Sequence, residues 1–294
     1  MNISNRHHYI PKFFIKEFIG SDGKLSVYNC KSKEIDPIRK SPKQVFFEWH
    51  RNSFEVDNEH SDFVEKLYKK VEDRFAPIYK EITKDIEHYE LTPYDMFHII
   101  HYIGVLHASL PVNDKQVEDF IKNSNKEDLG IKIMDTLTKN ESEDANSIYD
   151  EYKKEPAFVQ SAKIIKAITD YLRSDAWSSI KNWKPYYSRD NNQPHLLGDN
   201  PIILRDSEVN SIYDTEILFP LSKEITIFNT NGKDLIEIPA KDVVMIDVLT
   251  VLQANRMVCG PDEGYLKIIV ELAKKFPNKK TIDYAKEQIF KQFD

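Results

Sequence analysis

Apolar residues recur every three or four positions between residues 61 and 86, at Phe63, Leu67, Val71, Phe75, Ile78, Ile82 and Ile86. This spacing places them on one side of a long helix. Ser61 is suited to cap the start of that helix, and Pro77 predicts a kink or break midway along it.

A second helix is predicted from Thr92-Pro93-Tyr94-Asp95 to about Ala108. Thr serves as the N-cap, Pro suits the first position, and an acidic residue follows three positions after the cap. Because this segment is apolar on most sides, we expect it to be buried centrally. Pro111 ends it.

The N-terminal region combines helix-like and strand-like patterns. Residues 7–19 form a short amphipathic segment in which Pro11 suits a first helical turn. After the turn at Asp22-Gly23, a strand begins near Leu25, and a polar stretch to about residue 43 predicts a hairpin return and a loop.

The rest of the chain alternates between long helical and β-rich regions. Short β-like runs separated by turn signals fill residues 184–239. Helices are predicted for 156–177, 241–258, 263–275 and 281–293. We therefore predict an α+β fold that is predominantly α-helical, with an antiparallel β-sheet formed from the N-terminal hairpin and strands within about 184–239. We expect one domain over 1–294, with a charged helical insertion at about 112–155.

The composition of the chain indicates a cellular compartment but does not point to a binding partner. The chain has 294 residues, of which 40% are hydrophobic and 30% charged, as in an ordinary globular protein. A net charge of −7 gives no global attraction to nucleic acid or anionic membrane, although a local basic groove stays open. The lone thiols Cys30 and Cys259 suit a reducing compartment. No apolar run could span a bilayer and the start is unlike a signal peptide, so we expect a cytoplasmic protein without a membrane partner.

The opening segment of the chain is Arg6-His7-His8-Tyr9-Ile10-Pro11, followed by a Phe-rich stretch. Three later segments are residues 197–202 (Leu-Gly-Asp-Asn-Pro-Ile), 219–222 (Phe-Pro-Leu-Ser) and 253–256 (Gln-Ala-Asn-Arg). Together these four segments resemble the bacterial family called domain of unknown function 4238, with Gly198 in place of the family's usual Ser. The resemblance covers roughly residues 5–260. It implies a bacterial protein of unknown activity, for which a role in conflict or defence is an expectation.

One departure from the family concerns its central helix. That helix often ends in Arg-Thr-Pro in the family, whereas this chain has Ser109-Leu110-Pro111. The sequence leaves open whether Ser109 or His107 replaces the Arg.

The adjacent residues His7 and His8 are the first candidate site. On a helix their side chains would point about 100° apart, and on a strand they would point to opposite faces. One of them facing a site while the other packs is therefore the favoured geometry. The alternative is that both histidines only cap or pack.

Asp199-Asn200-Pro201 lies between two predicted strands. As structure, it is an Asx-type turn in which Pro201 forces Asn200 to be extended. As chemistry, Asp199 at a strand end could bind a metal ion or act as a general base.

A second pair of histidines, His98 and His101, is spaced as two ligands on one helical face would be. Hydrogen bonds to other side chains would account for them equally well. His107, near the end of the same helix, is favoured there by the helix dipole when protonated. The remaining histidines, His50, His60, His88 and His195, lack partners in sequence, and we treat them as structural.

Familiar phosphate-binding, zincin and hydrolase motifs are absent. We expect a metal-dependent, nuclease-like hydrolase that cleaves nucleic acid or another phosphoester, as a toxin or phage-defence effector. Its divalent cation would bind His8 and Asp199, or alternatively His98 and His101. His7, His8, Asp199 and Asn200 would be catalytic, and Arg6, Lys12 and Tyr9 would bind substrate. The alternative is a non-catalytic sensor or binding module in which the N-terminal motif is structural. An oligomer or a partner protein stays open.

Overall fold

The computed structural model describes residues 6–56, 59–85, 89–176, 178, 180–187, 193–209, 211–229 and 239–292. About half of the structure is helical and 15% is strand, and the sheets are antiparallel, so the predicted α+β class is confirmed. Ile86, His88 and Trp177, which the sequence patterns single out, lie outside the described residues. In the part of the chain that is described, no helix is long and apolar enough to cross a membrane.

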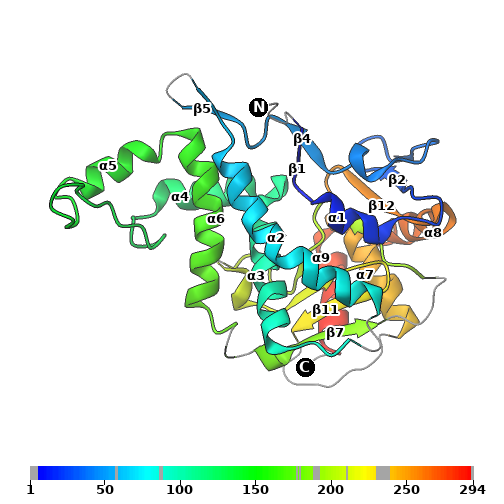
Figure 1. Ribbon diagram of the computed structural model, residues 1–294. Helices are drawn as coiled ribbons and strands as arrows, with labels where there is room; N and C mark the ends of the chain where they lie inside the picture. The colour runs from blue at the N-terminus through cyan, green and yellow to red at the C-terminus, as the bar shows by residue number, and fades with distance from the viewer. Residues whose placement is uncertain are drawn as a thin grey trace.

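One half of the molecule is a helical layer (Figure 1). Its central helices pack side by side: α2 (Phe63–Lys84), α3 (Pro93–Ser109) and α6 (Pro156–Arg173). The predicted charged insertion contains α4 (Asp114–Asn123) and α5 (Ala145–Tyr152), which share a small apolar cluster with α6. Helix α2 runs unbroken through Pro77, contrary to a predicted break there.

Helix α3 is buried and begins where the sequence indicates. Thr92 Oγ1 accepts the backbone N–H of Asp95 at 3.2 Å, and the Asp95 carboxylate accepts the N–H of Thr92 at 2.9 Å. This reciprocal capping box satisfies two N–H groups that the first helical turn leaves free. The α3 helix therefore forms the middle of the helical layer, between α2 and α6.

The β half contains two four-stranded antiparallel sheets rather than the single predicted sheet. The first has the strand order β7 (Trp183–Tyr187), β11 (Ile225–Asn229), β10 (Ile217–Pro220), β9 (Ile203–Leu204). The second has the order β3 (Glu34–Ile35), β2 (Ser26–Asn29), β12 (Met257–Gly260), β8 (Leu197–Gly198). The N-terminal hairpin thus pairs chiefly with β12, which the sequence patterns had assigned to the end of a helix.

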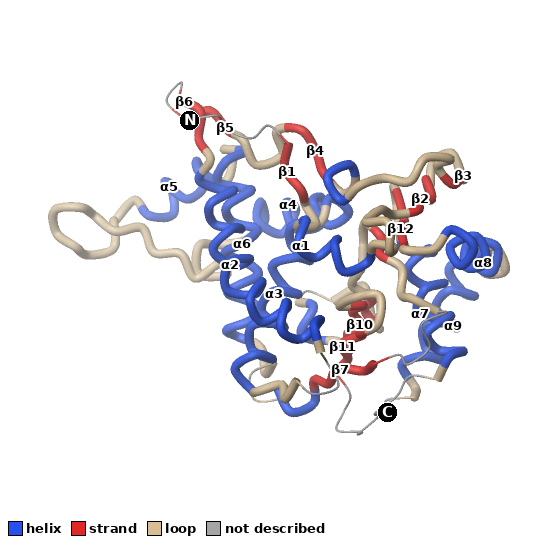
Figure 2. The backbone as a smooth tube through the Cα atoms, turned by 45° about the vertical axis from the view of Figure 1, so that its right-hand side comes forward, coloured by secondary structure: helices blue, strands red, loops and turns tan. Residues whose placement is uncertain are grey.

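Three C-terminal helices cover these sheets on the right of Figure 2. They are α7 (Ala240–Gln253), α8 (Glu263–Ala273) and α9 (Lys279–Phe290). Helix α7 packs with α9 against the first sheet and with α8 against the second. Because α7 has apolar neighbours on both sides, its sequence is apolar nearly all round rather than amphipathic.

The N-terminal segment joins the two halves. Strand β1 (Arg6–His8) pairs antiparallel with β4 (Phe47–Trp49), so His7 and His8 have the extended geometry, one of the two that the sequence left open. The short helix α1 (Lys12–Ile15) and the turn η1 (Lys16–Phe18) follow. The Phe14 ring stacks on Tyr79 of α2 at 5.2 Å between ring centroids and on Phe219 of β10 at 5.4 Å. A second small hairpin, β5 (Phe54–Val56) and β6 (Glu59–Ser61), leads into α2.

Candidate functional site

The two N-terminal histidines point to different environments, as their strand geometry requires. His7 is buried, 2% exposed, and its Nδ1 accepts the backbone N–H of Asn52 at 2.8 Å. His8 is half-buried against the Phe47 ring, at 5.8 Å between centroids. Burial, with the positive charges of Lys12 and Arg6, lowers the pKa of His8 to about 4. His8 is therefore neutral at pH 7.

The Asp199 side chain holds the loop that follows α7. One carboxylate oxygen accepts the backbone N–H of Asn255 at 2.9 Å, and the other accepts that of Arg256 at 2.8 Å. Burial raises the pKa of Asp199, and these two N–H groups oppose the rise. Both oxygens of this carboxylate therefore bind the backbone of a distant segment, and not the neighbouring N–H groups that an Asx-type turn would use.

Within the N-terminal motif, Tyr9 is a residue whose pKa is affected by the charge of Asp199. Its ring is 4% exposed, and its pKa is raised by burial first and then by the charge of Asp199. Arg256 lies in the same region and forms an ion pair with Glu48 of β4 at 2.5 Å. The sequence predicted that His7 or His8 would face the Asp199 turn, but the charges that shift the pKa of His8 are those of Lys12 and Arg6, and Asp199 affects Tyr9 instead.

The ion pair at Glu48 continues into the helical layer. Arg51 binds the other Glu48 oxygen at 2.7 Å and Asp114 at 2.6 Å, and it donates to the Ser109 carbonyl at 2.8 Å. Lys163, which is fully buried, binds the same Asp114 at 2.8 Å. A chain of alternating charges thus connects the β half with α4 and α6.

The residues expected to bind substrate make other contacts. The Arg6 guanidinium carbon lies 3.5 Å from the centroid of the Phe47 ring, a cation–π contact. Lys12 is exposed at the start of α1. Neither side chain lines one of the two cavities described below.

His98 and His101 sit among aromatic rings. His98 contacts Tyr94 and Phe97, and His101 stacks on Tyr171 at 5.5 Å between ring centroids. Burial, with His98 and Arg74, lowers the pKa of His101 to about 4. Across the described ranges, no group of three or more His, Cys, Asp or Glu side chains is arranged to hold a metal ion. The two predicted ligand pairs, His8 with Asp199 and His98 with His101, thus have no third such ligand there.

A small cavity of about 30 Å³ lies behind the N-terminal motif, and we call it the motif cavity. Its walls include His8, Glu65 and Glu72 of α2, and Tyr102 of α3. His8 Nε2 and Tyr102 Oη are buried and have no hydrogen-bond partner among the described residues. Burial, followed by the charges of Glu65 and Asp73, raises the pKa of Glu72 to about 8.

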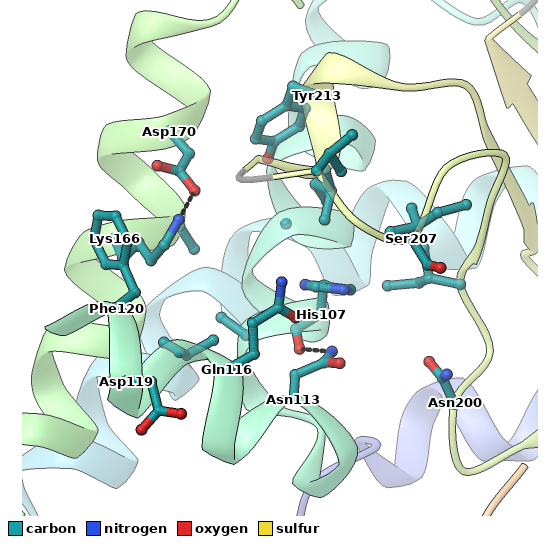
Figure 3. A pocket seen from close by; sticks show the side chains of 18 of the residues that line it. His107, Asn113, Gln116, Asp119, Phe120, Lys166, Asp170, Asn200, Ser207 and Tyr213 are labelled. Atoms are coloured by element: carbon teal, nitrogen blue, oxygen red, sulfur yellow. Dashed lines mark hydrogen bonds and ion pairs between the residues drawn. The ribbon is translucent and has the colours of Figure 1, made fainter. Parts of the chain in front are cut away.

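A larger pocket of about 460 Å³ opens where the helical layer meets the β half, and we call it the main pocket (Figure 3). Helices α3, α4 and α6 form one wall, and the segment after β8 forms the other. Its polar lining includes His107, Asn113, Gln116, Asp119, Lys166, Asp170, Asn200, Ser207, Tyr213 and Gln253. Asn200 of the predicted turn therefore lines the main pocket, whereas the neighbouring Asp199 accepts hydrogen bonds from the loop after α7.

Within the main pocket, His107 is the central polar group. Burial, together with the nearby Lys166, lowers its pKa to about 4, so the imidazole is neutral. Lys166 is paired with Asp170, and its ammonium lies 4.4 Å from the centroid of the Phe120 ring. Asn113 donates from Nδ2 to the His107 carbonyl at 2.7 Å, which leaves its own side-chain oxygen available.

At the edge of the main pocket, the Tyr213 side chain approaches helix α3 closely. The Tyr213 hydroxyl donates to the Ile100 carbonyl at 3.3 Å. A Cβ atom at Gly104 would lie 2.0 Å from that hydroxyl oxygen, so any other residue there would force the Tyr213 side chain to move. This close approach holds the Tyr213 ring against the helix at the edge of the pocket.

Sequence reasoning missed Glu72 and the main pocket. Glu72 lies on the same face of α2 as the buried Tyr68, Phe75 and Tyr79. A carboxylate on a buried helix face is unusual, and this pattern could have identified Glu72 from the sequence. No comparable signal marked Gln116 or Tyr213, because the pocket is made by segments that meet only in the folded chain.

His195 also has partners that the sequence did not reveal. Its Nε2 and Thr226 Oγ1 lie 2.6 Å apart, and its Nδ1 lies 3.3 Å from Asp247. The Asp247 carboxylate also accepts from the Tyr265 hydroxyl at 2.7 Å. His195, Thr226 and Asp247 are all fully buried and line neither cavity, so this network joins β11 to α7 and not to a site.

The structure therefore defines an α+β protein with a pocket between its halves and a buried N-terminal motif. The chain belongs to the family described as protein of unknown function (DUF4238), which matches residues 6–264. The resemblance seen in the sequence is thus confirmed. No curated protein and no solved structure matches the chain.

Proposed function

We propose that this protein is a ligand-binding module whose site is the main pocket, and in which the N-terminal motif is structural. The observation that carries this proposal is the His107 imidazole in a pocket of about 460 Å³. It lines the pocket and is neutral at pH 7, because burial and the nearby Lys166 lower its pKa to about 4. Pockets of this size that combine apolar walls with a few convergent polar groups are typical small-molecule sites.

The contacts of the motif support the structural role. His7 accepts a backbone N–H, the Tyr9 carbonyl accepts from Ser109 Oγ at 3.2 Å, and Phe14 fills the space between α2 and β10. Such contacts stabilise the junction of the two halves. They shape the main pocket indirectly, since its walls come from both halves.

The test is a binding screen of uncharged and charged small molecules by thermal shift, followed by calorimetry on the wild-type chain. We expect hits whose affinity falls about tenfold or more in His107→Ala. His7→Ala serves as the matched control and should lower the melting temperature while leaving the affinity of the folded protein unchanged. Hits that bind His107→Ala as tightly as wild type would reject the main pocket as the site.

The second candidate function is phosphoester hydrolysis, in the manner of a toxin or phage-defence effector. The motif cavity favours it, because a neutral His8 can accept a proton while a protonated Glu72 can donate one near pH 7. The assay uses DNA, RNA and a chromogenic phosphodiester, with and without Mg²⁺ or Mn²⁺. His8→Ala should abolish turnover while the variant remains folded by circular dichroism, and absence of turnover by the wild type on all three substrates would refute this function.

A further inference from the structure

The internal hydrogen bonds of the main pocket leave a particular set of polar atoms facing the cavity. Gln253 donates its Nε2 to the carbonyls of Asn200 and Ile202, so its side-chain oxygen remains available. The side-chain oxygen of Asn113 is available for the same reason. The neutral His107 adds one donor and one acceptor nitrogen. The pocket therefore presents both uncharged donors and uncharged acceptors.

The charges around the pocket disfavour an anionic ligand. Asp119, Asp128 and Asp170 line it together with two lysines, Lys166 and Lys286. Lys166 is already paired with Asp170, and burial lowers the pKa of Lys286. A phosphate group would meet at least as much negative as positive charge, and like charges repel strongly where water is displaced.

Two aromatic rings line the same space. Phe120 of α4 lies beside Lys166, and Tyr213 of the loop after β9 lies above His107 in the view of Figure 3. Asn and Gln side chains are the usual readers of the edges of nucleobases, and aromatic rings stack on their faces. A flat, uncharged, hydrogen-bonding ring system matches both features.

We infer that the main pocket binds a free nucleobase or nucleoside, in preference to a nucleotide or a nucleic-acid strand. This inference rests on the proposed ligand-binding function and names its ligand class. Asn200 is the residue placed to read the polar edge of the ring. It presents its side chain to the pocket while its backbone carbonyl is held by Gln253.

The experiment is calorimetric titration of the full chain with adenosine, guanosine, cytidine and uridine, and with their 5′-monophosphates. We expect at least one nucleoside to bind, and its monophosphate to bind about tenfold more weakly. Asn200→Leu and the shape-conserving Asn200→Asp should each weaken that nucleoside about tenfold or more. The matched control is Asn140→Leu, at an exposed loop position outside the pocket, and it should bind as wild type does. Circular dichroism confirms that each variant is folded.

Three results would overturn the inference. They are absence of binding by all four nucleosides, a monophosphate or an oligonucleotide that binds at least as tightly as the nucleoside, and full affinity in both Asn200 variants. The proposed function fails separately. If nucleosides do not bind but another neutral molecule does so in a His107-dependent way, only the ligand class is wrong, whereas a failed screen of all classes rejects the binding module itself.

Discussion

His7 Nδ1 and the backbone N–H of Asn52 lie 2.8 Å apart, and this contact ties the N-terminal strand to the turn after β4. Asn52 itself donates to Glu65 of α2 at 2.9 Å. The imidazole therefore takes part in the connection between β1, the β4 turn and the helical layer. These hydrogen bonds explain the presence of His7 without a catalytic role.

Replacing His7 by Ala leaves the Asn52 N–H buried without its acceptor, which costs about 1–3 kcal/mol of unfolding free energy. Urea denaturation followed by circular dichroism measures the loss. His8→Ala is the comparison, and its loss should be smaller because His8 is only half-buried, so water can reach the groups that it leaves. Equal stability of His7→Ala and wild type would contradict the structural role of the motif.

Asp199→Ala removes the acceptor of two backbone N–H groups in a buried position, and we expect a loss of about 2–4 kcal/mol. Asp135→Ala is a matched control, since Asp135 also accepts two backbone N–H groups, from Leu137 and Thr138, but in an exposed loop. Its loss should stay below about 1 kcal/mol, because water can replace the carboxylate there. Similar losses in both variants would show that burial of Asp199 does not matter.

Gly104→Ala forces a Cβ atom against the Tyr213 hydroxyl, and we expect a destabilisation of about 1–3 kcal/mol. Tyr213→Phe removes the oxygen with which that atom collides. In the double variant the Gly104→Ala change should therefore cost less than it does alone, which a double-mutant cycle in urea measures. Strictly additive effects would mean that α3 and the Tyr213 ring do not meet as described.

Acid should destabilise the protein through its neutral histidines. The folded-state pKa of His101 is about 4, below its ordinary value of 6.5. The stability linked to His101 is therefore present above pH 6.5 and is lost as the pH falls toward 4. In His101→Phe, which can keep the ring contact with Tyr171, unfolding free energy should fall less steeply over this window. The measurement is urea denaturation between pH 7 and pH 4, and an unchanged slope would argue against a neutral, buried His101.

Glu72 should have the opposite pH dependence. Its folded-state pKa of about 8 exceeds the ordinary value of 4.5, so the stability it contributes is present below pH 4.5 and is lost as the pH rises to about 8. The unfolding free energy of Glu72→Gln should rise relative to that of wild type over this pH range, by on the order of 4 kcal/mol at pH 8. The two proteins should be equally stable near pH 4. A constant difference at all pH values would mean that Glu72 does not titrate in this window.

The sequence was sufficient for features whose cause is local. The capping box of Thr92 and Asp95 and the apolar character of α3 both follow from neighbouring residues, and the structure contains both. The strand β12 could not be predicted in this way, because Val258 and Cys259 become a strand only when β2 lies beside them. Tertiary pairing there overrode the helical pattern of the preceding residues.

The candidate site was predicted only in part, for the same reason. The sequence singled out Asp199 and Asn200 together, but the structure separates them, with one carboxylate holding a loop and one amide facing a pocket. His107 was noticed for its place near a helix end, whereas its neutral state follows from burial and from Lys166 on α6. Contacts between distant segments decided these roles, and no local pattern encodes them.

The pairing of β2 with β12 also sets an order of events during synthesis. Val27 lies opposite Cys259, so the second sheet cannot form until residues 257–260 have left the ribosome. Until then the N-terminal hairpin has an unpaired edge, which is the kind of surface that aggregates or recruits chaperones. A pairing between such distant segments also predicts slow folding. Chains released before residue 257 should therefore be degraded or aggregate, even though they contain every residue of the helical layer.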